Sequence, residues 1–115
     1  MAGDVIFSLP ALANGLYYKF VYVGGQNDAQ DFQLNTGSNT NYFIGGIAHF
    51  DIDSADSSGG IPDMIYSNNS SNSRLNILTP SAGTWVEVYC DGTNWFVTGT
   101  SISSDDNGVT FANQS

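Results

Sequence analysis

The chain has 115 residues, of which 41% are hydrophobic and 13% aromatic, and its formal net charge is −9. This length fits one domain with a real core, which we expect to span residues 1–115. The acidity argues against nucleic acid as a partner, because binding to phosphates needs a basic face, and against an anionic membrane surface. Gly, Ser, Asn and Thr are abundant beside β-forming Val, Ile, Tyr, Phe and Trp, so the composition favours an all-β fold.

The N-terminal residues have neither the basic region nor the long apolar core of a signal peptide, and no apolar run approaches the roughly 20 residues of a membrane helix. We therefore expect synthesis in a cytoplasm without export by a classical route. The first strand is predicted from Asp4 to Leu9, before Pro10, which cannot donate to a ladder. Residues 1–10 are expected to form either an edge strand of the domain or an N-terminal arm that pairs with a neighbouring subunit. The edge strand is favoured because the segment leads directly into the next strand.

The longest strand pattern runs from Gly15 to Val23. Side chains alternate across a strand, so the pattern divides into two faces. One face carries Leu16, Tyr18, Phe20 and Tyr22, and the other carries Tyr17, Lys19, Val21 and Val23.

Shorter patterns follow in the middle and at the end of the chain. Between Tyr42 and Asp53 we expect two strand pieces, with a bulge or bend at Gly45 and Gly46. The low-complexity run 67–73 is expected to be exposed, and 101–108 is a polar connection. Further strands are expected at 31–34, 61–66, 74–78 and 109–112. About eight short, mostly antiparallel strands at this spacing predict one compact β-sandwich or β-barrel.

The clearest element is a hairpin between Trp85 and Gly99, signalled by Asp91-Gly92 between alternating apolar runs. A two-residue loop places Val88 opposite Trp95. A loop of four residues, 91–94, places Val88 opposite Val97 and Cys90 opposite Trp95. Both alternatives remain open, but both give the same core face, because alternation does not depend on the register. That face carries Val86, Val88, Cys90, Trp95 and Val97, so the single cysteine is expected to be a packed free thiol.

The opposite face of the hairpin is unusually aromatic, with Trp85, Tyr89 and Phe96 beside Glu87. Together with Tyr17, these rings form more apolar surface than solvated strands need, which indicates a contact surface. They are candidates for stacking on sugars or for burial under a neighbouring subunit. Burial is favoured, because the sequence does not show the polar groups that a sugar site needs beside its rings.

Few residues suggest reaction chemistry. His49 is the single histidine, and no nucleophile or carboxylate pattern accompanies it, so we expect a packed or rim residue. Asp51, Asp53 and Asp56 lack the spacing and the downstream Glu of a calcium loop, so a solvated turn is expected there and cation binding stays open. The sequence therefore predicts no catalytic residue, no cofactor and no metal site, and the protein is not expected to be an enzyme.

Two segments of the chain contain motifs that are similar to patterns of a known family. Residues 8–21, SLPALANGLYYKFV, are similar to an LPA-x-x-x-G-x-x-Y-x-F stretch, and residues 88–99, VYCDGTNWFVTG, are similar to a DGTNWYV-x-G ending. Both recur in this order in small β domains of tailed phages, particularly marine ones. The family includes capsid decoration proteins and fibre or spike modules.

The resemblance implies a non-enzymatic virion structural protein on the capsid surface. A chain of one domain favours a decoration, or cement, protein that bridges coat subunits; the alternative is a fibre or spike tip that binds a receptor or glycan. The implied partners are the major capsid protein and further copies of the chain in a homotrimer, without nucleic acid or membrane. The candidate contact residues are Val5, Ile6, Phe7, Tyr17, Trp85, Tyr89 and Phe96.

Overall fold

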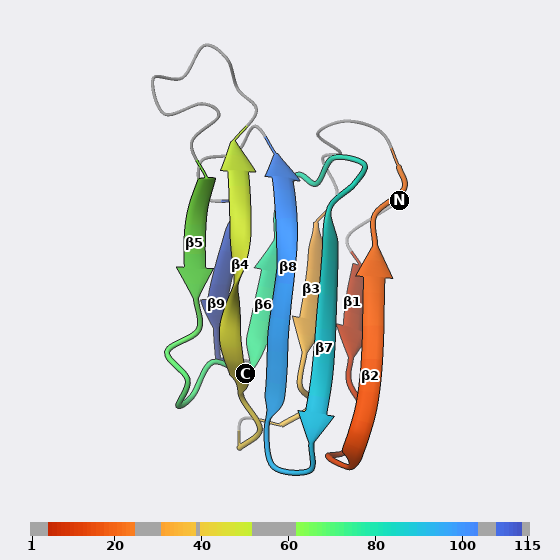
Figure 1. Ribbon diagram of the computed structural model, residues 1–115, viewed down its shortest axis with the longest axis vertical. Helices are drawn as coiled ribbons and strands as arrows, with labels where there is room; N and C mark the ends of the chain where they lie inside the picture. Colours follow the sequence, from red (N-terminus) through yellow and green to blue (C-terminus); the bar gives the residue numbers. More distant parts are fainter. Residues whose placement is uncertain (1–4, 25–30, 39, 52–61, 104–107, 114–115) are drawn as a thin grey trace.

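The computed structural model describes residues 5–24, 31–38, 40–51, 62–103 and 108–113, and nine strands occur in these ranges (Figure 1). No described residue is helical, so the all-β prediction is confirmed. The strands are β1 (Val5–Ser8), β2 (Asn14–Val21), β3 (Phe32–Asn35), β4 (Phe43–Asp51), β5 (Pro62–Tyr66), β6 (Arg74–Ile77), β7 (Trp85–Asp91), β8 (Trp95–Ser103) and β9 (Val109–Ala112).

The strands form two sheets that pack as a β-sandwich. One sheet has four strands in the order β1-β3-β6-β9, and the other has five in the order β2-β7-β8-β4-β5. Among the described strands, β1 pairs with β3 and β4 pairs with β8 in parallel, and the other pairs are antiparallel. The mostly antiparallel sandwich therefore agrees with the strand pattern in the sequence.

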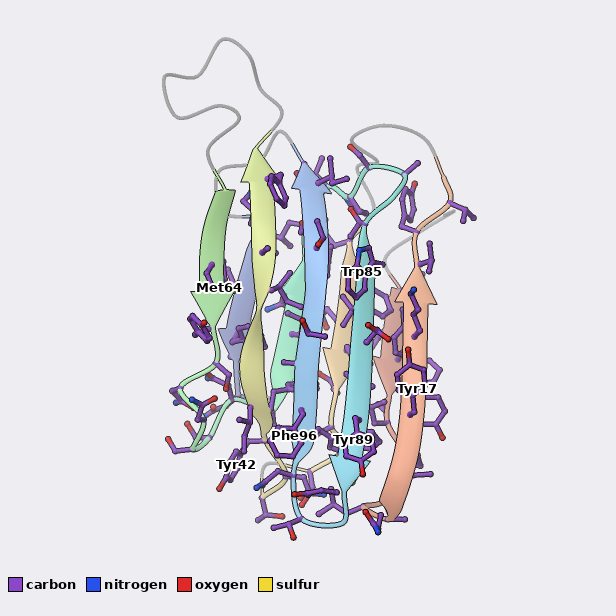
Figure 2. The ribbon with its side chains drawn as sticks, viewed as in Figure 1. Tyr17, Tyr42, Met64, Trp85, Tyr89 and Phe96 are labelled. Atoms are coloured by element: carbon purple, nitrogen blue, oxygen red, sulfur yellow. The ribbon has the colours of Figure 1, made fainter. Side chains whose placement is uncertain are left out.

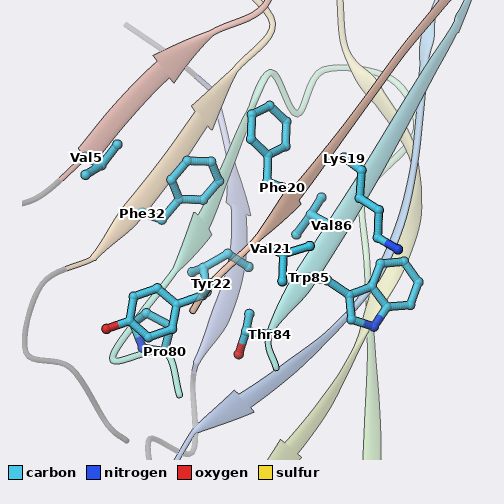
Figure 3. Close-up of a pocket in the computed structure, with 11 residues that line it drawn as sticks. Val5, Lys19, Phe20, Val21, Tyr22, Phe32, Pro80, Thr84, Trp85 and Val86 are labelled. Carbon is cyan, nitrogen blue, oxygen red and sulfur yellow. The ribbon is translucent and has the colours of Figure 1, made fainter. Parts of the chain in front are cut away.

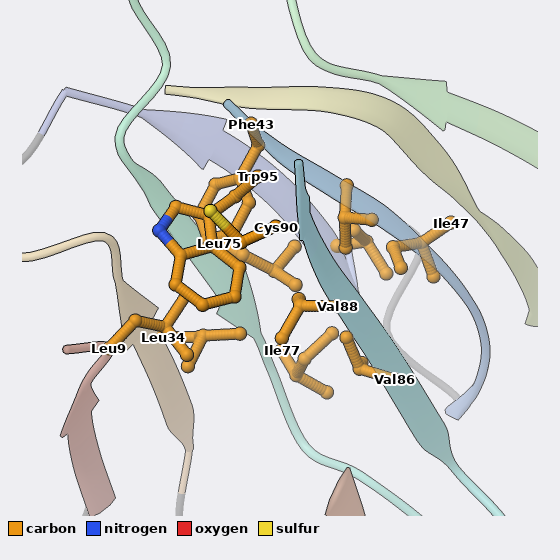
Figure 4. Close-up of a cluster of buried hydrophobic side chains, with 12 residues drawn as sticks. Leu9, Leu34, Phe43, Ile47, Leu75, Ile77, Val86, Val88, Cys90 and Trp95 are labelled. Atoms are coloured by element: carbon orange, nitrogen blue, oxygen red, sulfur yellow. The ribbon is translucent and has the colours of Figure 1, made fainter. Parts of the chain in front are cut away.

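The core lies between the sheets, and Trp95 is its largest fully buried side chain (Figure 4). Full burial of a Val, Leu, Ile or Phe side chain in this core stabilises the folded state by about 1.5–3 kcal/mol compared with leaving that side chain in water. The predicted inner face of the hairpin is confirmed, and Cys90 is a buried free thiol. The buried hydrophobic residues are Leu9, Leu34, Phe43, Ile47, Leu75, Ile77, Val86, Val88, Cys90, Trp95, Val97 and Val109.

The hairpin has the longer of its two alternative loops. Cys90 lies opposite Trp95, and Val88 lies opposite Val97. The Asp91 carboxylate accepts hydrogen bonds from the backbone N–H groups of Asn94 and Thr93, both at 2.9 Å, and these bonds lower the pKa of Asp91. The side chain of Asp91 thus organises the loop and fixes the register.

The expected break at Gly45 and Gly46 is wrong, because β4 is one strand. Its register with β8 is the same on both sides of the glycines, from Phe43 opposite Trp95 to Ala48 opposite Thr100. Gly45 has φ +111°, and a Cβ there would overlap the carbonyl oxygen of Val97. The glycine therefore permits close approach of two backbones and does not mark a bulge.

Two polar runs also differ from expectation. Ser67 and Ser73, at the ends of the low-complexity run, are buried, and the Ser67 hydroxyl donates to the Phe43 carbonyl at 2.6 Å. Strand β8 continues to Ser103, so Ser101 and Ser103 are buried strand residues. Small hydroxyl side chains enter the interior where backbone or side-chain partners satisfy them.

Candidate functional site

Three aromatic side chains lie side by side on the outer face of the five-stranded sheet, and we call them the aromatic row. Tyr17 of β2 is opposite Tyr89 of β7, and Tyr89 is opposite Phe96 of β8. The exposed fractions of Tyr17, Tyr89 and Phe96 are 54%, 44% and 39%. Figure 2 shows the three side chains on neighbouring strands. The outward direction predicted for these residues is confirmed, and the strand order makes them neighbours.

Polar and charged groups occupy the next register positions beside the aromatic row. Lys19, Glu87 and Thr98 follow one another across β2, β7 and β8. The Tyr17 hydroxyl donates a hydrogen bond to the Glu87 carboxylate, and this bond raises the pKa of the Tyr17 phenol. The Lys19 ammonium lies 5.1 Å from the centre of the Trp85 ring, a cation–π distance.

A shallow hollow of about 270 Å³ lies between the aromatic row and these polar side chains. Its aromatic side offers apolar ring faces, while Glu87 offers a hydrogen-bond acceptor and Thr98 offers a donor and an acceptor. The residues that line the hollow are Tyr17, Glu87, Val88, Tyr89, Phe96, Val97 and Thr98.

Trp85 shares this face but lies apart from the aromatic row. Trp85 precedes Glu87 by two residues on β7 and is opposite Val21 on β2 and Thr100 on β8. Its side chain is only partly exposed. Figure 2 shows Trp85 nearer the other end of the sheet. The structure therefore brings together three of the four outward aromatics that the sequence singles out.

The candidate contacts Val5, Ile6 and Phe7 belong to the other sheet. They form β1, which pairs with β3 at the sheet edge, so the edge-strand alternative describes the folded chain. The Phe7 ring packs against Phe20, with ring centres 5.0 Å apart, whereas Ile6 is 64% exposed. No described strand pairs with the other side of β1.

The outer face of the four-stranded sheet is a further surface, which no pattern in the sequence indicates. Alternation places its residues opposite the core positions, and none of these outward side chains is a carboxylate. We call it the carboxylate-free face. Arg74 Nε donates to Asn35 Oδ1 at 2.9 Å, and Asn76 Nδ2 donates to Thr110 Oγ1 at 3.0 Å. Its alternating positions are Ile6 and Ser8, which are exposed, Gln33, Arg74, Asn76, Thr110 and Ala112, which are partly buried, and Asn35, which is buried under the Arg74 hydrogen bond.

An apolar pocket of about 380 Å³ lies between the sheets near β1 and β2 (Figure 3). Phe20 and Phe32 line it from opposite sheets, and their ring centres are 5.5 Å apart. Val5, Ile77, Pro80 and Val86 extend the apolar lining. Strand alternation in the sequence indicates inward side chains, but a space between sheets depends on how the sheets pack and has no sequence signal.

His49 is a packed residue, as expected. Its exposed fraction is 2%, and its Nδ1 lies 3.3 Å from the hydroxyl oxygen of Ser101, which is fully buried. This His–Ser pair joins β4 to β8 inside the sandwich.

The acidic segment for which a solvated turn is expected, with cation binding left open, lies largely outside the described residues. Asp53 and Asp56 fall in the undescribed range 52–61, and Asp51 is described only as the backbone end of β4. Within the described ranges, no three His, Cys, Asp or Glu side chains cluster in a way that holds a metal ion. No helix in the described part of the chain is long and apolar enough to cross a membrane.

Comparisons of this chain with protein-family models, with curated proteins and with solved structures give no match. The resemblance of residues 8–21 and 88–99 to phage virion proteins therefore stays a prediction, and the surfaces described above are the observations from which function is inferred.

Proposed function

We propose that this protein is a non-enzymatic structural protein of a tailed-phage virion, which decorates the outside of the capsid and stabilises the shell by bridging coat subunits. The observation that supports this proposal is the β1 edge beside the carboxylate-free face. This is a strand edge without a described partner, on a sheet face whose eight alternating strand positions, two of them in β1, carry no acidic side chain.

The β1 edge offers two kinds of attachment to a coat subunit. The outer backbone groups of β1, with which no strand in the described ranges pairs, are suited to pairing with a strand of the partner, which supplies main-chain hydrogen bonds. Ile6, at 64% exposure, contributes about 25 cal/mol for each Å² of apolar surface that the partner covers, before entropic costs. Among the described residues of the carboxylate-free face, Arg74 is the only charged one. The face would therefore not repel a coat surface that is acidic.

Capsid binding tests this proposal directly. Expanded capsids assembled from the coat protein of the same genome are mixed with the wild-type protein, with Ile6→Asp and with the matched control Thr98→Asp on the opposite outer face. We expect the wild type and the control to bind alike, and Ile6→Asp to bind at least roughly tenfold more weakly, because the interface would bury an unpaired carboxylate. Absence of wild-type binding, or equal binding of both variants, would contradict the proposal.

The protein is proposed to act as a homotrimer, in solution or on its lattice. Acidic copies repel one another unless apolar surface holds them together. Val21, Val23 and Trp85 provide such surface at one end of β2 and β7, and Val23 is 84% exposed. Light scattering is expected to give three times the 12.3 kDa mass of one chain, or the bound density is expected to have threefold symmetry. Monomers in both states would exclude the trimer.

The alternative function is a fibre or spike tip module that binds a receptor or glycan. Such a module has no reason to bind the capsid lattice, so the same capsid-binding measurement separates it from a decoration protein.

A further inference from the structure

We propose that the hollow on the outer face of the five-stranded sheet binds an uncharged oligosaccharide. The aromatic row forms its apolar side, and Glu87 and Thr98 form its polar side. This site lies on the sheet opposite the β1 edge, so it does not depend on how the protein attaches to a capsid.

The aromatic row has the geometry of a stacking platform. Tyr17, Tyr89 and Phe96 are in register on three consecutive strands, which gives a row about 10 Å long from the strand spacing of about 4.8 Å. The face of an aromatic ring carries partial negative charge, and the C–H groups on one side of a sugar ring carry partial positive charge, so the two surfaces attract each other. A row of this length matches a short oligosaccharide better than a single sugar ring.

The polar side chains supply the partners that sugar hydroxyls need. One oxygen of Glu87 accepts the hydrogen bond from Tyr17, which holds the carboxylate beside the row. A carboxylate has about four acceptor sites, so Glu87 retains acceptors for ligand hydroxyls. Thr98, in the adjacent register position on β8, can both donate and accept. This combination of ring faces and oriented polar groups is the feature that sequence alone does not show.

Charge selects the class of sugar. The chain has a net charge of −9, and the Glu87 carboxylate places one negative charge at the hollow itself. This charge disfavours carboxylated and sulfated sugars. The nearest described cation is Lys19, whose ammonium lies over the Trp85 ring. An uncharged oligosaccharide avoids the repulsion and still donates hydroxyl hydrogens to the carboxylate.

A second copy of the chain fits this surface less well. Packing a flat protein face over the hollow would remove water from the Glu87 carboxylate, which is costly without a cation to pair with it. Of the two Lys and Arg residues in the sequence, Lys19 of β2 is opposite Glu87 but holds its ammonium over the Trp85 ring, and Arg74 bonds to Asn35 on the opposite sheet. A sugar satisfies the carboxylate with hydroxyl donors and leaves its other oxygens in water.

Glycan binding by the full chain tests the proposal. Uncharged gluco-, manno- and galacto-oligosaccharides and their carboxylated and sulfated counterparts are titrated while backbone amide NMR shifts are recorded. We expect an uncharged oligosaccharide to bind, with shifts centred on the aromatic row. Tyr89→Ala should weaken binding about tenfold or more, and Glu87→Gln should weaken it several-fold. The matched control Tyr66→Ala removes a 65% exposed tyrosine from β5 and should bind as the wild type does.

Three results would overturn the proposal: no binding of any uncharged oligosaccharide, a preference for the charged counterparts, or unchanged binding by Tyr89→Ala. Self-association that Tyr89→Ala abolishes, without sugar binding, would assign the surface to a second copy instead. Thermal unfolding of each variant verifies that it is folded. Failure here leaves the capsid-binding result of Ile6→Asp unaffected, so the two proposals fail separately.

Discussion

At the scale of single residues, Trp95 connects the hairpin to the core. It is fully buried, its ring lies 6.2 Å from that of Tyr18, and its Nε1 is the one buried side-chain nitrogen or oxygen without a partner among the described residues. Trp95→Ala is expected to cost about 3–5 kcal/mol through cavity formation. Trp95→Phe should cost less, because it keeps most of the volume and removes the unpartnered donor. Urea denaturation measures both, and a loss below about 1 kcal/mol for the alanine variant would contradict the central position of this ring.

Tyr17 provides a second test at the residue scale. Its hydrogen bond to Glu87 raises the pKa of the phenol above the ordinary value, so the protonated form is favoured in the folded state. The contribution to stability is therefore fully present below the ordinary tyrosine pKa and is lost as the pH rises through the higher folded value. Glu87→Gln should lower the Tyr17 pKa in an NMR titration of the ring carbons. An unchanged Tyr17 pKa would mean that the two side chains do not interact in solution.

At the scale of elements, β4 depends on a glycine that no other residue can replace without a shift. Gly45 combines φ +111° with close approach to the Val97 carbonyl, whereas Gly15 has φ +88° and open space around its missing side chain. Gly15→Ala should therefore cost only the backbone strain of about 1–2 kcal/mol. Gly45→Ala should cost clearly more, because it also separates β4 from β8. Equal losses in denaturation experiments would show that the overlap at Val97 relaxes freely.

The elements also show why parts of the fold follow from the sequence and others do not. The inner face of the hairpin is predictable, since alternation puts Val88 and Trp95 inside in either register. The loop length is not, because it depends on the Asp91 side chain accepting two backbone hydrogen bonds. Two consecutive glycines at Gly45 and Gly46 inside a strand pattern suggest a bulge. The role of Gly45 in the fold depends instead on the parallel pairing of β4 with β8. Ser67 appears in a run that composition marks as exposed, and its buried hydrogen bond to Phe43 has no local signal.

The candidate site also has one part that the sequence predicts and another that depends on the strand order. Alternation predicts that Tyr17, Tyr89 and Phe96 point outward, but their meeting requires β2 to pair with β7, and Tyr17 and Tyr89 are far apart in the chain. Sequence patterns do not fix such long-range strand order. The separation of Ile6 from these aromatics, on the other sheet, likewise follows from topology. The structure thus divides the candidate contact residues: the four aromatics lie on the five-stranded sheet, Ile6 lies on the outer face of the other sheet, and Phe7 packs against Phe20.

At the scale of the whole molecule, the two outer faces have different chemistry. The four-stranded sheet presents amide and hydroxyl side chains without a carboxylate, while the five-stranded sheet presents the aromatic row beside Glu87. A sandwich with two unlike faces can attach to a shell through one and expose the other to solvent. The net charge of −9 on each chain makes copies repel one another except where apolar contacts join them.

A reconstruction of expanded capsids carrying the bound protein tests this orientation most directly. We expect density for the sandwich on the outside of the shell, with β1 and the carboxylate-free face against the coat subunits. Tyr17, Tyr89 and Phe96 should then face solvent. Capsids without added density, or density in which the five-stranded sheet lies against the coat, would contradict the proposed mode of attachment.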